Sequence, residues 1–138
     1  MIYLKPSNNI YPIERILSAA TYLSSGFVGF IWLIIASLMK KRITPFLMYH
    51  IFQSIFLSIA YFILVKLSQL VYVILYRIPL INAIPYYLNM PLPLFYNLSL
   101  IQLITSLIIL YLAITAFMGQ YSYIPYVSNI IDRNVGRK

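Results

Sequence analysis

The side chains able to do chemistry in this chain are few. His50 is the only histidine, Glu14 and Asp132 are the only carboxylates, and there is no cysteine. Two acids, one imidazole and no thiol cannot supply a carboxylate pair, a Ser–His–Asp triad or a Cys–His pair. They also fall short of the three or four ligands that a metal centre needs, and no glycine-rich phosphate loop is present. We therefore expect no catalytic site, no metal ion, no cofactor and no enzymatic activity.

The remaining polar groups are amides and hydroxyls inside apolar stretches. From Ile43 to Val65 there is no Lys, Arg, Asp or Glu, and the polar residues of this stretch recur at helical spacing. Buried in a membrane, such side chains either form interhelical hydrogen bonds, worth about 1 kcal/mol each, or line a groove for a passing polypeptide. The first role is favoured, and the polar faces of two helices are expected to meet. The residues concerned are His50, Gln53, Ser58, Ser99, Gln102 and Ser106.

The composition indicates a membrane protein. The 138 residues are 62% hydrophobic and 9% charged, whereas soluble proteins are about 25% charged. A soluble chain of this length cannot bury so much apolar surface, so we expect the lipid bilayer to surround it. The net charge of +8 comes from basic residues at the ends of hydrophobic segments, not from one patch, so we expect no nucleic-acid partner.

The predicted fold is all-α, a polytopic membrane helical bundle forming a single integral membrane domain over 1–138. Pro12 and Glu14 favour a helix start, as do Thr44 and Pro45, and Gly119 favours a helix end. The segments are a polar lead (1–11), a first helix or helical hairpin (12–40), a central helix (43–76), a proline-rich interfacial segment (78–93), a last span (94–118) and a basic tail (119–138).

The segment 12–40 has two readings. Ile16–Leu38 can be one span whose small residues let a neighbour approach, or it can break near Ser25–Gly26 into a hairpin of two short helices. Length favours one span, because each half of a hairpin is only about 21 Å long. Charge favours the hairpin and four membrane helices, because eight of the ten basic residues then share the inner side. Four membrane helices are the favoured prediction, and three spans are the alternative.

Prolines and tyrosines mark the membrane surface. Pro79, Pro85, Pro91 and Pro93 rule out a continuous helix, so we predict an irregular segment on the far face. The tyrosines of the tail, Tyr121, Tyr123 and Tyr126, are expected at the headgroup level, and a short amphipathic turn is expected beyond Pro125.

Three segments carry a resemblance to a known family. They are ERILSAATYL at 14–23, TPFLMYHIFQSIFLSI at 44–59 and GQYSYIPYVSNIIDRNV at 119–135. In this order and spacing they resemble the Tic-twenty family, the small multi-span subunit of the translocon at the inner envelope of chloroplasts. Met48 and His50 depart from the family pattern, which has a basic residue and an Asn there. The positions that correspond to the family motifs are Arg15, Ser18, Ala19, Ala20, Tyr22, Leu23, Tyr49, His50 (at the family's Asn position), Gln53, Gly119, Ile124, Pro125 and Ser128.

The resemblance implies four membrane helices with both ends on the stromal side. It also implies a role in preprotein import through a protein-conducting channel, with other translocon membrane subunits and transiting preproteins as partners. The expected location is the plastid inner envelope membrane, and the alternative is a bacterial or cyanobacterial inner membrane. The expected lack of a transit peptide and the abundance of Ile and Tyr, which have AT-rich codons, fit a plastid-encoded chain.

Two other functions compete with import. The chain can be a structural or assembly subunit of another membrane complex. A small-solute carrier is less favoured, because no carboxylate lies within the apolar segments.

Overall fold

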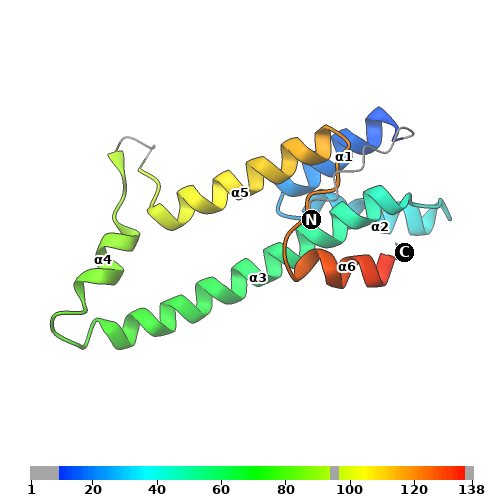
Figure 1. Cartoon of the computed structure of the whole chain (residues 1–138). Helices are drawn as coiled ribbons and strands as arrows, with labels where there is room; N and C mark the ends of the chain where they lie inside the picture. The colour runs from blue at the N-terminus through cyan, green and yellow to red at the C-terminus, as the bar shows by residue number, and fades with distance from the viewer. Residues whose placement is uncertain (1–9, 94–96, 136–138) are drawn as a thin grey trace. The chain divides into compact units, whose positions relative to one another are not determined.

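The computed structural model describes residues 10–93 and 97–135, and this part of the chain is all-helical, as predicted (Figure 1). One isolated β-bridge joins Leu92 and Leu98. Two helices, α3 and α5, are long and apolar enough to cross a membrane, which is fewer than the four membrane helices expected. The helices are α1 (Pro12–Leu23), α2 (Phe27–Leu38), α3 (Pro45–Leu75), α4 (Ala83–Asn89), α5 (Leu100–Phe117) and α6 (Val127–Val135).

The first apolar segment breaks where the hairpin reading placed the break. Gly26 has a φ of 87°, in the left-handed region that favours glycine, and its N–H donates to the Thr21 carbonyl at 2.7 Å. α1 and α2 therefore form as separate helices of 12 residues each. Each is about 18 Å long, shorter than the hydrocarbon core of about 30 Å.

Local rules fix the start of α3 and the end of α5. Pro45 opens α3, and the Leu47 N–H donates to the Thr44 hydroxyl at 3.4 Å. At the end of α5, Gly119 has a φ of 76° and its N–H donates to the Ala116 carbonyl at 3.0 Å. Thr44, Pro45 and Gly119 thus play the roles that the sequence predicted.

The predictions for residues 78–118 need two corrections. The proline-rich segment is not wholly irregular, because it contains α4, where Pro85 lies in the first turn and needs no N–H partner. The last helix begins at Leu100 and not at 94. Asn97 has a φ of 59°, and Ser99 forms a capping pair with Gln102, so the helix starts after them. Residues 94–96 lie outside the described part.

The chain divides into two compact units. Unit 1 comprises residues up to Ile59 and from Ile109 onward, and unit 2 is Ala60–Ile108. In unit 1 two apolar clusters form the core: Tyr22 with Leu112, Ala113 and Ala116, and Tyr49 with Val127 and Ile131.

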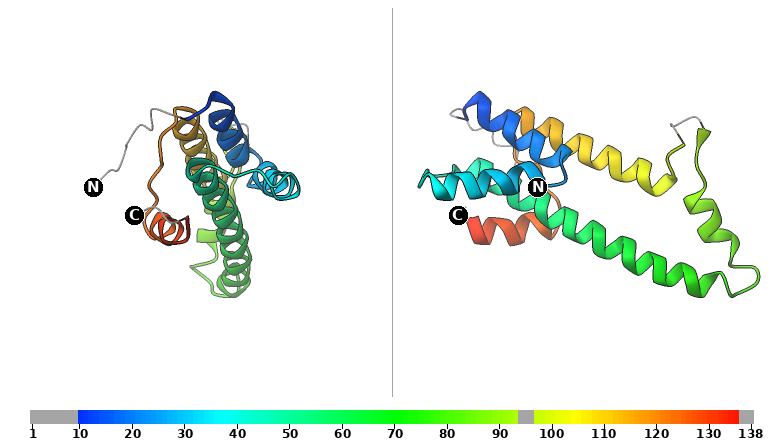
Figure 2. Two further views of the ribbon diagram at one scale, coloured as in Figure 1. Left: turned by 90° about the vertical axis from the view of Figure 1, so that its right-hand side faces the viewer. Right: turned by 180° about the vertical axis from the view of Figure 1, so that it is seen from behind.

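Within unit 1 three helix ends share one side. The start of α1, the end of α2 and the end of α6 lie at the same end of this unit in Figure 1 and in the right-hand view of Figure 2. The tail beyond Pro125, predicted as a short turn, is the nine-residue helix α6. α6 packs on α3 through Val127 and Ile131.

Candidate functional site

The predicted polar residues of α3 lie inside unit 1. His50 and Gln53 are separated by one helical turn and share a face, and neither has any exposed surface. Both meet Tyr22 of α1, whose hydroxyl lies 2.8 Å from His50 Nδ1 and 2.6 Å from Gln53 Oε1. The imidazole and the amide therefore turn inward and make interhelical contacts, which is one of the two roles the sequence allowed.

Ser122, in the connection between α5 and α6, completes the cluster. Its carbonyl oxygen accepts the Tyr49 hydroxyl at 2.8 Å and the Gln53 amide nitrogen at 3.2 Å. Its own hydroxyl donates to Gln53 Oε1 at 3.4 Å. Tyr49 also lies 2.8 Å from the hydroxyl of Ser128 at the start of α6. These hydrogen bonds join α1, α3 and the tail, and we call Tyr22, Tyr49, His50, Gln53, Ser122 and Ser128 the polar core.

Counting protons assigns the direction of these bonds. A carbonyl oxygen only accepts, so the amide nitrogen of Gln53 must face Ser122 and its oxygen must face Tyr22. The Tyr22 hydroxyl donates its one proton to that oxygen, so at the 2.8 Å contact it accepts from His50. His50 therefore carries a proton on Nδ1.

The same accounting applies to Tyr49. Its proton goes to the Ser122 carbonyl, so the Ser128 hydroxyl supplies the proton of the contact between Tyr49 and Ser128. The Ser128 oxygen in turn accepts the Ile124 N–H at 2.8 Å. The tail is thus attached to α3 through a main-chain carbonyl and a side-chain hydroxyl.

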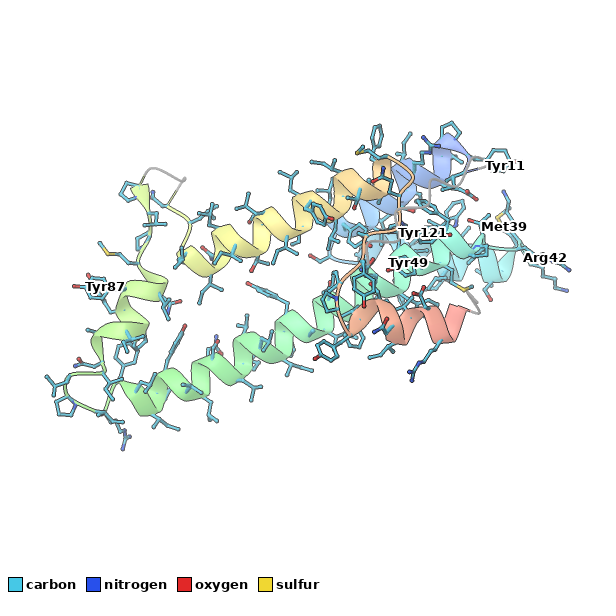
Figure 3. All side chains as sticks on the ribbon, viewed as in Figure 1. Tyr11, Met39, Arg42, Tyr49, Tyr87 and Tyr121 are labelled. Carbon is cyan, nitrogen blue, oxygen red and sulfur yellow. The ribbon has the colours of Figure 1, made fainter. Side chains whose placement is uncertain are left out.

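Aromatic rings surround the imidazole. Phe46 lies edge-on to it at 4.5 Å between ring centroids, and Tyr121 stacks on it at 6.0 Å with an interplanar angle of 17°. Tyr121 also meets Tyr49 edge-on, with ring centroids 5.1 Å apart; both residues are labelled in Figure 3. The half-buried ring of Tyr121 thus packs against the polar core, and its expected place at the headgroup level stays a prediction. Tyr123 and Tyr126 are exposed.

Ser58 braces the turn between α1 and α2. Its hydroxyl lies 2.7 Å from the Ser25 carbonyl and 2.9 Å from the Ser54 carbonyl. Near this turn, α2 lies close to α1 and α3 at Gly29. A Cβ added there would lie 2.6 Å from Thr21 Cγ2 and 3.0 Å from Ile51 Cγ1. The contact between α1, α2 and α3 is therefore tight at this point.

The second predicted set, on α5, has a different setting. Ser99, Gln102 and Ser106 belong to unit 2. The Ser99 N–H donates to Gln102 Oε1 at 3.0 Å and the Gln102 N–H donates to the Ser99 hydroxyl at 3.3 Å, so this pair caps the helix. Gln102 and Ser106 are exposed. That the two sets meet across a helix pair stays a prediction.

The polar core holds hydroxyls, one amide and one imidazole. Among the described residues, no group of three or more His, Cys, Asp or Glu is placed to hold a metal ion. Tyr22, Tyr49 and Ser128 are among the residues that correspond to the family motifs, but nothing in the sequence pointed to Ser122 as a member of the polar core. Its main contribution is a carbonyl oxygen, which every residue has, so no side-chain pattern signals it.

Comparisons of the chain with protein-family models, curated proteins and solved structures find no match.

Proposed function

We propose that this protein is a membrane subunit of a preprotein translocon in the plastid inner envelope, contributing to a protein-conducting channel with other translocon subunits. The observation that supports this most is where the three resembling segments lie. Segment 14–23 supplies Tyr22, segment 44–59 supplies Tyr49, His50 and Gln53, and segment 119–135 supplies Ser122 and Ser128, hence the whole polar core.

The proposed topology has four membrane helices with both chain ends on the stromal side. α3 and α5 are the two long spans, and α1 with α2 is a short hairpin within the same membrane. Both polar ends of the Gln53 amide and the Nδ1 atom of His50 have partners inside unit 1. Unit 1 therefore serves as a self-contained anchor, because polar groups in lipid need internal partners.

Contact with a preprotein is assigned to unit 2. Its exposed polar side chains include Gln69, Gln102 and Ser106, and they lie among exposed apolar side chains such as Ile104. A surface of this kind suits a polypeptide in extended form, which brings both polar main-chain groups and apolar side chains.

The test is site-specific photo-crosslinking during import. A photoreactive amino acid replaces Ser106, with Ile108 as the matched control two positions along the same exposed helix. Residue Gln53 is unsuitable as a probe site, because it is fully buried. We expect an arrested preprotein to be captured from position 106 in excess over position 108. Capture of lipid alone from both positions would argue against a conducting role.

One observation favours a structural or assembly subunit of another membrane complex as the second candidate. His50 and Gln53 of α3 are fully buried in unit 1 and are hydrogen-bonded to residues of that unit. They therefore cannot line a channel. Purification of the native complex separates the two candidates. Import components among the co-purified subunits support the translocon, and the subunits of a different complex support the alternative.

A further inference from the structure

The connection between α2 and α3 displays three consecutive cations. Lys40, Lys41 and Arg42 are all exposed. Lys40 has a φ of 51°, its N–H donates to the Ser37 carbonyl at 3.2 Å, and the Lys41 N–H donates to the Ala36 carbonyl at 2.9 Å. This left-handed ending holds the backbone of the turn, so the cations occupy a defined place at the end of α2.

Apolar side chains lead directly up to these cations. Leu38 is 78% exposed and Met39 is 68% exposed, and Phe30 and Ile34 continue the exposed apolar surface back along α2. Met39 and Arg42 are labelled at the end of α2 in Figure 3. The order along the helix, apolar side chains and then cations, is the order in which a lipid presents its acyl chain and its headgroup.

Basic side chains outnumber the acids in the described part of unit 1. Glu14 in α1 and Asp132 in α6 are the only carboxylate side chains in the sequence. Set against them are five cations: Lys40, Lys41, Arg42, Arg15 of α1 and Arg133 in the last turn of α6. The start of α1 and the ends of α2 and α6 lie at the same end of this unit in Figure 1, so positive charge prevails there.

We propose that this end of unit 1 binds anionic phospholipids selectively, with the lipid phosphates held by Lys40, Lys41 and Arg42 and the acyl chains lying along Leu38 and Met39. Guanidinium and ammonium groups are suited to phosphate oxygens. The exposed apolar surface next to the cations favours a lipid over an acidic soluble protein, which would leave that surface uncovered. The inference does not depend on the proposed role in import.

Trp32 provides a reporter for this site. It is the only tryptophan in the chain, it is half-buried on α2, and it precedes Lys40 by about 12 Å of helix. Bromine atoms on lipid acyl chains quench tryptophan fluorescence on contact. The purified full chain is reconstituted in phosphatidylcholine vesicles that contain brominated phosphatidylglycerol or, at the same mole fraction, brominated phosphatidylcholine.

We expect the anionic lipid to quench Trp32 more strongly. When one cation contacts the lipid phosphate, phosphatidylglycerol should associate about five times more tightly than phosphatidylcholine. The triple variant Lys40→Gln, Lys41→Gln, Arg42→Gln should bring this ratio to about one, and high salt should reduce it in the unmodified chain. The matched control is Lys66→Gln with Arg77→Gln, which removes charge from unit 2 and should keep the ratio.

Three results would overturn the proposal. The first is equal quenching by the two lipids in the unmodified chain, which needs no variant to fold. The second is a triple variant that keeps the preference while its circular dichroism is unchanged. The third is a control variant that loses the preference as fully as the triple variant, because net charge and not this turn would then attract the lipid.

Discussion

Unit 1 encloses the side chains of the polar core, whereas unit 2 leaves nearly all of its described side chains at least partly exposed. In unit 1 the imidazole of His50 and the amide of Gln53 have no exposed surface. In unit 2 only Pro85 and Ser99 are buried among the described residues. The polar core thus finds hydrogen-bond partners within unit 1, while unit 2 must have its apolar surface covered by lipid or by other proteins. Substitutions should therefore act on stability in unit 1 and far less in unit 2.

This contrast can be measured on the protein in detergent micelles. Trp32 lies in α2, so its fluorescence reports on unit 1, and circular dichroism reports on all helices. Unfolding by a denaturing detergent gives the free energy of unfolding for each variant.

The largest effect is expected at Gly29. In Gly29→Leu the new side chain meets Thr21 and Ile51 at distances that force α2 away from its neighbours. We expect a loss of about 3 kcal/mol in the free energy of unfolding, read from Trp32 fluorescence. The control is Ser106→Leu on the exposed face of α5, for which we expect about 0.5 kcal/mol or less. Equal effects of the two substitutions would remove the distinction between the units.

The next largest loss of stability is expected at the buried amide of Gln53, with the exposed amide of Gln69 as its control. Gln53→Leu removes the acceptor of the Tyr22 proton and one donor to the Ser122 carbonyl, which leaves buried polar groups without these partners. We expect a loss of about 2–3 kcal/mol. Gln69→Leu, at an exposed position of the same helix, should change the free energy by about 0.5 kcal/mol or less. A Gln53 variant as stable as the Gln69 variant would mean that the polar core does not hold unit 1 together.

A smaller effect is expected from removing one hydroxyl. Tyr22→Phe keeps the ring in its apolar cluster but removes the acceptor for His50 and the donor to Gln53. The expected loss is about 1–2 kcal/mol. The exposed Tyr61 of α3 supplies the control, since Tyr61→Phe should leave the unfolding curve unchanged. If Tyr22→Phe also leaves the curve unchanged, the proton assignment through this hydroxyl fails.

The smallest effect is expected in unit 2. Ser99→Ala removes the hydroxyl that accepts the Gln102 N–H at the start of α5. We expect a loss of about 1 kcal/mol, as for other helix caps, together with a small decrease in helical circular dichroism. Trp32 fluorescence should not change at low denaturant, because Trp32 belongs to the other unit. A change in that fluorescence would show that the units are energetically coupled.

The sequence predicted the helical architecture better than it predicted the site. Pro12, Thr44 with Pro45, and Gly119 were correct as helix boundaries, because capping depends on residues a few positions apart. α4 was missed, because four prolines in one segment obscured a helix that has Pro85 in its tolerant first turn. The stacking of Tyr121 on His50 was not predicted, because interfacial preference says nothing about a neighbouring imidazole.

Composition and periodicity by themselves determined that this chain is apolar and helical and that its few polar side chains follow one face of the central helix. Only the tertiary structure decided which groups meet: His50 and Gln53 share the Tyr22 hydroxyl, and the Ser122 carbonyl receives Gln53 and Tyr49. The physical reason is the sequence separation over which each kind of interaction acts. Helix formation depends on neighbours within about four residues, whereas these contacts join residues far apart in the chain, and one of them uses a main-chain oxygen that carries no sequence signal.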